Sequence, residues 1–312
     1  MGYTQKLANP TGSLVYLRDC IQSYDGLNGG DPRSPVWFCA LEQADNLAEE
    51  ESPINVEELK KYKDAYFYLT PEQTDNNIIG KFGNSKTGTR GGSAFYRSQY
   101  GILTALIENT SEYRRMTRAR PAGRKYHYFG EHRFGYSLNV SPIPMLSRSK
   151  SETEWSAKKI LKTPEYDKAV SLAEWTGIPS YREFFSVCAR LRKPLFTALR
   201  KQYTPAVIYC GGLIALNEFK DLWMDAGTEN ELFKHELILN QDYYHRWLDN
   251  GEGKNPTLLV VGPFFCNRNG LNSYAKYWNV ARLIRDLCND KLVHEENWLR
   301  LSEFLPPEGG SV

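Results

Sequence analysis

The sequence predicts a three-layer α/β/α sandwich around a central, mainly parallel four-stranded sheet. Four short apolar runs, rich in β-branched and aromatic residues, are typical of buried strands at residues 36–41, 134–140, 205–210 and 257–262. Stretches with helical periodicity lie between or after them, at residues 171–202, 211–225 and 273–290. Strands that alternate with helices form a sheet covered by helices on both faces.

The length and composition favour one domain. The chain has 312 residues, of which 41% are apolar, and this is enough for a substantial core. We find no internal repeat, and the Gly- and Ser-rich stretch at residues 80–101 has the composition of a surface loop. We therefore predict a single domain over residues 1–312 with loop insertions at about residues 48–130 and 145–200.

Several classes of protein are disfavoured by composition. The six cysteines include no C-x-x-C pair, which argues against a structural zinc site, an iron–sulfur cluster and a secreted disulfide framework. We expect most of them to be reduced core residues, and we expect no metal and no cofactor. The N-terminus lacks a signal-peptide pattern, and no segment approaches the roughly 18 apolar residues of a membrane span. A soluble, cytoplasmic protein without a membrane partner is expected.

Polar residues follow the first predicted strand directly. The stretch VWFCALEQAD, residues 36–45, brings Glu42, Gln43 and Asp45 to the carboxyl end of an apolar run. In open α/β sheets ligands bind at that end, so Glu42 is a candidate general base or charge-stabilising group and Asp45 a second candidate. The alternatives are a helix N-terminal carboxylate for Glu42 and an N-cap or exposed position for Asp45.

Two later stretches carry amides at strand ends. Asn139, in YSLNVSPIPML, lies within a run that otherwise has the pattern of a buried strand. Its amide can pair with backbone groups or read the edge of a pyrimidine, because it offers a donor beside an acceptor.

The stretch VVGPFFCNRNGLNSYAKYW, residues 260–278, leads from a strand through a polar loop into a helix. Its loop can simply cap the helix at Asn272 or Ser273, or it can contact phosphate and base. In the second case the contact residues are Asn267, Arg268, Asn269 and Asn272, with Phe264, Phe265 or Leu271 as an apolar wedge.

A basic patch precedes the Asn139 strand. The net charge of the chain is only +2, so attraction to a polyanion needs a local patch. Residues 113–133 provide one, with aromatic residues between the basic ones. Such a run is often a solvated face, but its position favours contact with nucleic-acid phosphates. The predicted DNA-binding residues of this patch are Arg114, Arg115, Arg118, Arg124 and Lys125.

Taken in order, these features resemble the uracil-DNA glycosylase superfamily. In that family a strand ends in a motif of the type G-Q-D-P or G-I-N-P, whose Asp or Asn positions or activates water, and FCALEQ aligns Glu42 with that position. The family's L-L-L-N strand carries the Asn that reads the flipped pyrimidine, and YSLN aligns Asn139 with it. A later strand and helix resemble TPAVIYCGGLIALNEF, and the family's H-P-S-P motif with its intercalating loop aligns with GPFFCNRNGLNS. The resemblance spans most of residues 34–290.

The chain departs from the family at three places. The His of the second motif becomes Gly262, which leaves Asn267, Arg268 or Asn269 as substitute donors. Gln43 replaces the Pro after the catalytic position, and the cysteine spacing of the iron–sulfur branches is missing. A longer carboxylate and a pocket without the His suit a base other than plain uracil, such as a hypermodified cytosine of phage DNA.

The resemblance implies a monofunctional DNA glycosylase that flips a pyrimidine, a modified cytosine or uracil, and leaves an abasic site. Its catalytic residues are Glu42 and Asp45, and the base is bound by Gln43 and Asn139 and stacked on Tyr66 or Phe67. The role is DNA repair or antiviral defence. A catalytically inactive sensor of modified DNA or nucleotides on the same fold is an alternative, as is a nucleotide hydrolase of unrelated α/β type, although the glycines of YCGGLIALN do not form a phosphate-binding motif.

Overall fold

The computed structural model describes fourteen stretches of the chain, and every structural statement below refers to these residues. They are residues 10–22, 29–30, 32–41, 54–55, 98–99, 101–103, 105–106, 136–141, 152–225, 227–228, 233–238, 240–265, 270–290 and 299.

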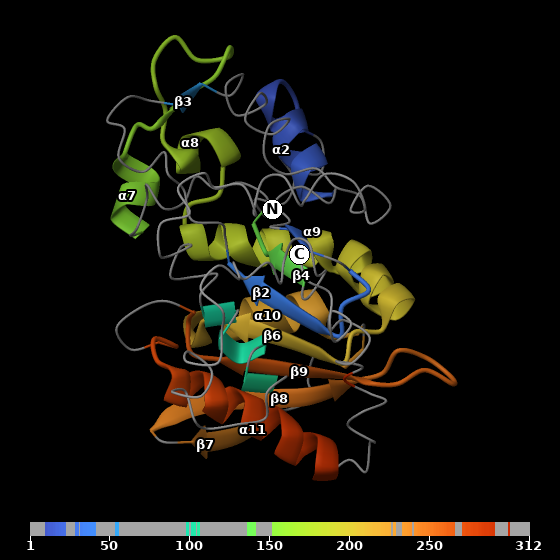
Figure 1. The fold of residues 1–312 in the computed structure, drawn as a ribbon. Coiled ribbons are helices and arrows are strands. Elements are labelled where there is room, and N and C mark those ends of the chain that lie inside the picture. The colour runs from blue at the N-terminus through green and yellow to red at the C-terminus, as the bar shows by residue number, and fades with distance from the viewer. Residues whose placement is uncertain are drawn as a thin grey trace, which may run out of the picture.

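The main feature of the fold is a seven-stranded sheet with four parallel strands at its centre (Figure 1). The strand order is β1-β4-β2-β6-β9-β8-β7, and the pairs β4–β2, β2–β6 and β6–β9 are parallel. The four predicted strands are therefore confirmed as neighbours in one sheet, but the sheet is larger than predicted because three antiparallel strands extend it at its two edges. The strands are β1 (Gly29–Gly30), β2 (Val36–Ala40), β4 (Tyr136–Asn139), β6 (Val207–Gly211), β7 (Lys234–Ile238), β8 (Gln241–Leu248) and β9 (Thr257–Gly262).

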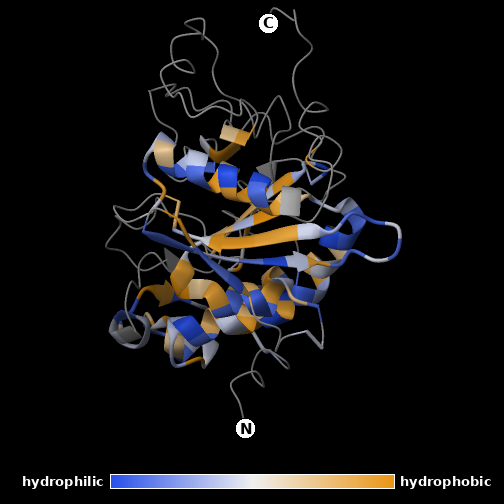
Figure 2. Cartoon of the chain, turned by 90° about the horizontal axis from the view of Figure 1, so that it is seen from below, coloured by the Kyte–Doolittle hydropathy of each residue, from blue (hydrophilic) through white to orange (hydrophobic). Residues whose placement is uncertain are grey.

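Helices cover both faces of this sheet (Figure 2). On one face, α9 (Tyr181–Tyr203) and α10 (Leu216–Trp223) pack on alternate strand residues such as Trp37 and Ile208. On the other face, α11 (Tyr274–Asp290) packs on the intervening residues, together with the helical residues 98–99, 101–103 and 105–106, which we call the crossover segment. Side chains that alternate between two apolar layers explain why each central strand is an unbroken apolar run.

The predicted helical stretch at residues 171–202 forms two helices, which are separated by residues 177–180. The short helix α8 (Leu172–Thr176) begins with a capping box between Ser171 and Glu174 and ends at Gly177, whose φ of 70° is in the left-handed region. The helix α9 then begins after Ser180, whose side chain accepts a hydrogen bond from the backbone N–H of Glu183. Each helix therefore has a local stop and start signal in the sequence.

Residues 152–203, most of the second predicted insertion, contribute to the same core as the sheet. They contain α7 (Glu152–Ala157), β5 (Leu161–Lys162), α8 and α9. Trp155, Trp175 and Phe184 belong to one apolar cluster with residues of β2 and β6, and this cluster includes Leu17 of α2 (Ser13–Ile21). A separate two-stranded sheet pairs β5 with β3 (Ile54–Asn55) in parallel.

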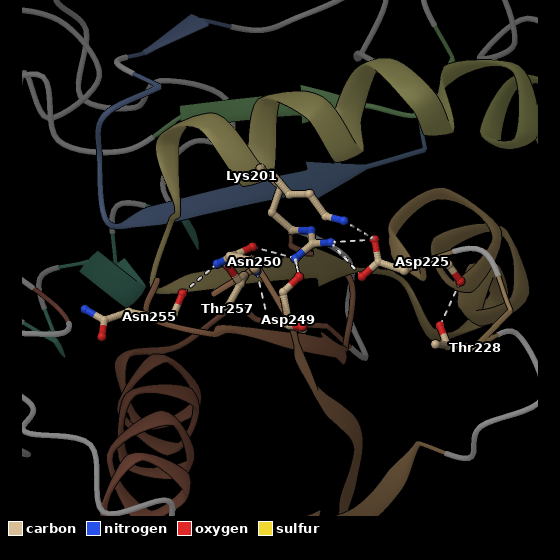
Figure 3. A network of polar contacts seen from close by, with 9 residues as sticks. Lys201, Asp225, Thr228, Asp249, Asn250, Asn255 and Thr257 are labelled. Carbon is tan, nitrogen blue, oxygen red and sulfur yellow. Dashed lines mark hydrogen bonds and ion pairs between the residues drawn. The ribbon is translucent and has the colours of Figure 1, made fainter. Parts of the chain in front are cut away.

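A polar network surrounds Arg200 at the amino ends of β6 and β9 (Figure 3). The guanidinium of Arg200, which is fully buried, donates hydrogen bonds to both carboxylate oxygens of Asp225 at 3.0 Å, to Asn250 Oδ1 at 2.5 Å and to the carbonyl oxygen of Asp249 at 2.8 Å. Asn250 donates in turn to the hydroxyl of Thr257 at 2.8 Å. The network therefore joins the ends of α9 and α10 to the β8–β9 connection.

Five of the six cysteines are described, and all five are free thiols in the core, as predicted: Cys20, Cys39, Cys188, Cys210 and Cys288. Cys266 lies outside the described residues. Burial raises the pKa of the Cys188 thiol to about 12, so this group is inert at neutral pH. Among the residues that the structure describes, no helix is long and apolar enough to cross a membrane.

Candidate functional site at the carboxyl ends of the parallel strands

The order of the four parallel strands defines where a ligand would bind. Along the chain β2 comes first, β4 is added on one side of it, and β6 and β9 are added on the other side. Within the connection from β2 to β4, the crossover segment packs on one face of the sheet, whereas α9, in the connection from β4 to β6, packs on the other face. This reversal makes a topological switch point between β2 and β6, and ligands in such sheets bind outside the carboxyl ends of the strands there.

The strands that precede the two principal candidate residues lie side by side. Ala40 of β2 is the direct Cα partner of Asn139 of β4. The hydrogen bonds continue past the strands, because the N–H of Val140 donates to the Ala40 carbonyl at 2.8 Å and the N–H of Ser141 donates to the Leu41 carbonyl at 2.7 Å. These two strands are therefore neighbours in the sheet, and Glu42 is the next residue in the chain after this ladder ends.

Most of the predicted site residues fall outside the described part of the chain, so their positions stay predictions. These are Glu42, Gln43, Asp45, Tyr66, Phe67, Arg114, Arg115, Arg118, Arg124, Lys125, Asn267, Arg268 and Asn269. The backbone of Asn139 is described as the last residue of β4, but its side chain is not. Asn272 is described: it is exposed and lies two residues before α11 begins at Tyr274.

The loop after β9, of which residues 263–265 and 270–273 are described, is held at its base by buried groups. The N–H of Leu271 donates to the carbonyl oxygen of Phe264 at 2.8 Å. The buried hydroxyl of Ser98, on the crossover segment, donates to the carbonyl oxygen of Leu271 at 2.7 Å and also contacts the carbonyl oxygen of Phe265. We call these contacts the Ser98 clamp. It joins Phe265 and Leu271, the described residues on either side of this part of the loop, to the crossover segment.

The prediction of an apolar wedge in this loop is wrong for two of its three residues. Phe265 and Leu271 have no exposed surface, because both belong to the apolar layer between the sheet and α11. Only Phe264 is half-buried. A side chain that already fills the core is not available to enter a base step.

Gly211, Gly212 and Gly262 lie at the carboxyl ends of β6 and β9. At Gly211 and Gly262, neighbouring side chains leave no room for a Cβ atom. A Cβ on Gly211 would lie 2.4 Å from a ring carbon of Phe265. A Cβ on Gly262 would lie 2.6 Å from the hydroxyl oxygen of Tyr209 and 2.7 Å from the ring of Tyr243. The position aligned with the family's histidine is therefore filled from two neighbouring strands, and no side chain fits there.

The tyrosine beside Gly262 is a neutral structural group. The hydroxyl of Tyr209 donates to the carbonyl oxygen of Pro263 at 2.9 Å, which ties β6 to the start of the loop after β9. Burial, with smaller contributions from Tyr243 and Cys210, raises the pKa of Tyr209 well above its usual value. Tyr209 therefore serves as a hydrogen-bond donor and not as a base.

The structure adds one exposed residue that the sequence reasoning missed. Ile214 follows β6 in the short 3₁₀ turn at Leu213–Ala215, and 69% of it is exposed. It is one of three large hydrophobic residues described as exposed, together with Tyr166 and Leu237. An exposed isoleucine beside the switch point offers an apolar contact for a ligand, whereas its sequence, GGLIALNEF, indicates only a helix start.

The crossover segment also contacts β4 close to Asn139. The side chain of Gln99 is buried, and its amide nitrogen donates to the hydroxyl of Ser137 at 3.3 Å. Ser137 lies two residues before Asn139 on the same strand. Through Ser98 and Gln99, adjacent residues of the crossover segment therefore contact both the loop after β9 and the strand that carries Asn139.

No group of three or more possible metal ligands occurs among the described residues. The comparisons with known proteins found no match to the chain among protein-family models, curated proteins or solved structures.

Proposed function

We propose that this protein is a monofunctional DNA glycosylase that extrudes a pyrimidine nucleotide and hydrolyses its N-glycosidic bond. The observation that carries the proposal is the parallel pairing of Ala40 with Asn139. Two strands that end together at the carboxyl edge support a shared pocket for one base, to which we assign Asn139 and Glu42, two residues after Ala40. The resemblance to the uracil-DNA glycosylase superfamily supplies the roles of the two residues.

In the proposed reaction, the Asn139 amide pairs with the edge of the flipped base, and Tyr66 or Phe67 stacks on its face. The bond between C1′ and the base nitrogen breaks, and the base leaves with the bonding electrons and takes up a proton. Glu42 stabilises the positive charge that develops on the sugar and orients a water molecule, whose oxygen attacks C1′ while its proton is released. The products are a free base and an abasic site.

The base is proposed to be a modified cytosine or a uracil. The closed packing around Gly262 supports a site without the family's histidine, because Tyr209 and Tyr243 occupy the space of any side chain there. A base with a bulky substituent, such as a hydroxymethylated or glucosylated cytosine of phage DNA, suits a pocket that lacks this donor, and excision of such a base would serve antiviral defence. Phosphate contacts are assigned to the Arg114–Lys125 patch and to Asn267–Asn272.

The same observation at Gly262 favours a second candidate, a sensor that binds modified DNA without cleaving it. Loss of a catalytic donor with retention of the fold is what an inactive binding protein would show. Both the glycosylase and the sensor would bind DNA, but only the glycosylase would release a base.

The experiment is an alkali-cleavage assay on uracil-containing DNA, unmodified DNA and DNA with hydroxymethylated or glucosylated cytosine. We expect alkali-labile sites on one of the modified substrates with the wild-type protein and none with Glu42→Gln. The matched control is Glu252→Gln, which makes the same change at an exposed residue of the β8–β9 connection. DNA binding without alkali-labile sites would establish the sensor, and binding of free nucleotides but not DNA would contradict both.

A further inference from the structure

The strand β7 ends the sheet, and its outer edge is uncovered in the described part of the chain. It pairs on one side with β8, and among the described residues no strand pairs with its other side. Lys234, His235, Glu236 and Leu237 are all exposed, and Leu237 is 63% exposed. An uncovered edge offers unpaired backbone groups to an additional strand.

The hairpin geometry identifies which backbone groups face outward. Ile238 and Gln241 are the last pair of the β7–β8 ladder and are joined by two residues, of which Asn240 has a φ of 60°, the left-handed value taken at the second central position of a type I′ turn. In such a hairpin the closing pair exchanges hydrogen bonds, and hydrogen-bonded and non-hydrogen-bonded pairs then alternate along the ladder. The N–H and C=O groups of His235 and Leu237 therefore point away from β8, toward the free edge.

The side chains of β7 are complementary to a second copy of the same strand. An antiparallel register centred on His235 places Lys234 of one copy opposite Glu236 of the other, and the symmetry repeats this pair. These residues then form non-hydrogen-bonded pairs, in which cross-strand side chains approach most closely. A register centred on Glu236 would instead oppose two carboxylates, and one centred on Leu237 would leave both charges unmatched.

Charged residues on edge strands usually prevent pairing, but here their signs alternate. Lys234 and Glu236 flank His235. In the twofold register each lysine therefore lies opposite the glutamate of the other copy, and the two charges attract instead of preventing pairing. The imidazole of His235 is held on its own hairpin, where Nε2 lies 2.8 Å from Asp242 Oδ1 and the ring lies 5.0 Å from that of Tyr244. This position keeps the side chain against β8 and leaves the backbone edge open.

We propose that two copies of this chain associate through antiparallel pairing of β7 with β7, centred on His235. The interface is isologous, because each copy contributes the same strand, and the sheet becomes continuous across the dimer. A twofold axis normal to the sheet reverses the strand direction. The carboxyl ends of the parallel strands therefore point in opposite directions in the two copies, and the two candidate sites lie on opposite edges of the dimer.

The test is sedimentation velocity of the full-length protein from low micromolar concentration upward. We expect a concentration-dependent dimer for the wild type. His235→Pro removes the outward N–H at the centre of the interface and is tolerated on an edge strand, so we expect it to be monomeric with unchanged circular dichroism. Lys234→Glu makes both symmetric pairs repulsive and should weaken the dimer about tenfold or more.

The decisive variant is the charge swap, Lys234→Glu combined with Glu236→Lys, which restores two opposite-charge pairs and should restore the dimer. Lys254→Glu is the control for net charge, because it makes the same charge change on the exposed β8–β9 connection and should leave the dimer intact. A wild-type protein that stays monomeric at every concentration, or a dimer that survives His235→Pro, would overturn the proposal.

Discussion

The hydroxyl oxygen of Tyr209 lies 2.6 Å from the position that a Cβ atom would take on Gly262. The ring of Tyr243 lies 2.7 Å from the same point, and both tyrosines belong to the apolar layer between the sheet and α11. A glycine at the end of a strand suggests a turn, but this one is required by side chains from β6 and β8. A side chain therefore cannot be introduced at residue 262 by one substitution without displacing these tyrosines.

We predict that Gly262→His destabilises the protein and does not increase base release. A new side chain must displace two buried tyrosines, and overpacking of this kind costs about 1–3 kcal/mol. Urea unfolding measures the cost, and the alkali-cleavage assay measures activity. As a control, Gly262→Ala in a Tyr209→Phe background removes the nearest clashing atom. The double variant should then lose less free energy of unfolding than the sum of the two single variants. Additive losses would contradict the proposed clash.

The central strands and the helices that cover them follow from the sequence, whereas the antiparallel edge does not. Residues 36–40, 207–211 and 257–262 are buried at every position, so they appear as unbroken apolar runs. In β8 the buried residues Tyr243, His245 and Leu248 are separated by the partly exposed Tyr244, Arg246 and Trp247. In β7 the first four residues are exposed. A search for continuous apolar runs misses such strands, since their stability comes from pairing with β9 and with each other.

At the candidate site, the ends of the strands can be found from local patterns in the sequence, whereas long-range contacts cannot. Local patterns located the ends of the strands that carry Ala40 and Asn139, whereas the pairing of these two residues is a long-range contact. Ser98 is 173 residues away from Leu271, and nothing in the Gly- and Ser-rich sequence around it indicates a buried clamp. Phe265 looked like an exposed loop residue, but only the fold shows that it fills the space left by Gly211.

We predict that Ser98→Ala loosens the loop after β9. The substitution leaves the buried carbonyl groups of Phe265 and Leu271 without the Ser98 hydroxyl, which costs about 1–3 kcal/mol. Amide hydrogen exchange should become faster in residues 264–271 than in β9 itself. The KM for DNA should rise with less change in kcat. The control is Ser156→Ala on α7, whose exposed hydroxyl donates to the carbonyl oxygen of Thr153 at 3.2 Å and should affect none of these quantities. Equal acceleration of exchange throughout the sheet would show that Ser98 acts on the whole core instead.

We predict that Ile214→Asp weakens DNA binding without lowering stability. Because 69% of Ile214 is exposed, its loss removes little buried area, so the free energy of unfolding should change by less than about 0.5 kcal/mol. A carboxylate beside the carboxyl ends of β2 and β6 should repel the phosphate backbone and lower affinity severalfold, as fluorescence anisotropy with labelled DNA would show. Tyr166→Asp is the matched control, because Tyr166 is also exposed but belongs to the connection between β5 and α8, not to the turn that follows β6. Equal losses for both variants would point to a general charge effect.

The last prediction concerns the opposite edge of the sheet, where Arg200 joins α9, α10 and the β8–β9 connection. Arg200→Met removes the donor for both oxygens of Asp225, for Asn250 and for the carbonyl of Asp249, and these acceptors lie in a largely enclosed site. We expect a loss of about 2–3 kcal/mol in the free energy of unfolding, which is below the value for a fully buried pair because Asp225 is 26% exposed.

The neighbouring lysine provides the control for this prediction. Lys201 lies 3.3 Å from the same Asp225 oxygen, but its side chain is 45% exposed. Lys201→Met should therefore cost less than about 0.5 kcal/mol, because exposed ion pairs contribute little. Both variants should retain the wild-type rate of base release per folded molecule, since the network lies at the amino ends of β6 and β9. A large loss for Lys201→Met would show that the charge of Asp225, and not the buried hydrogen bonds of Arg200, stabilises this junction.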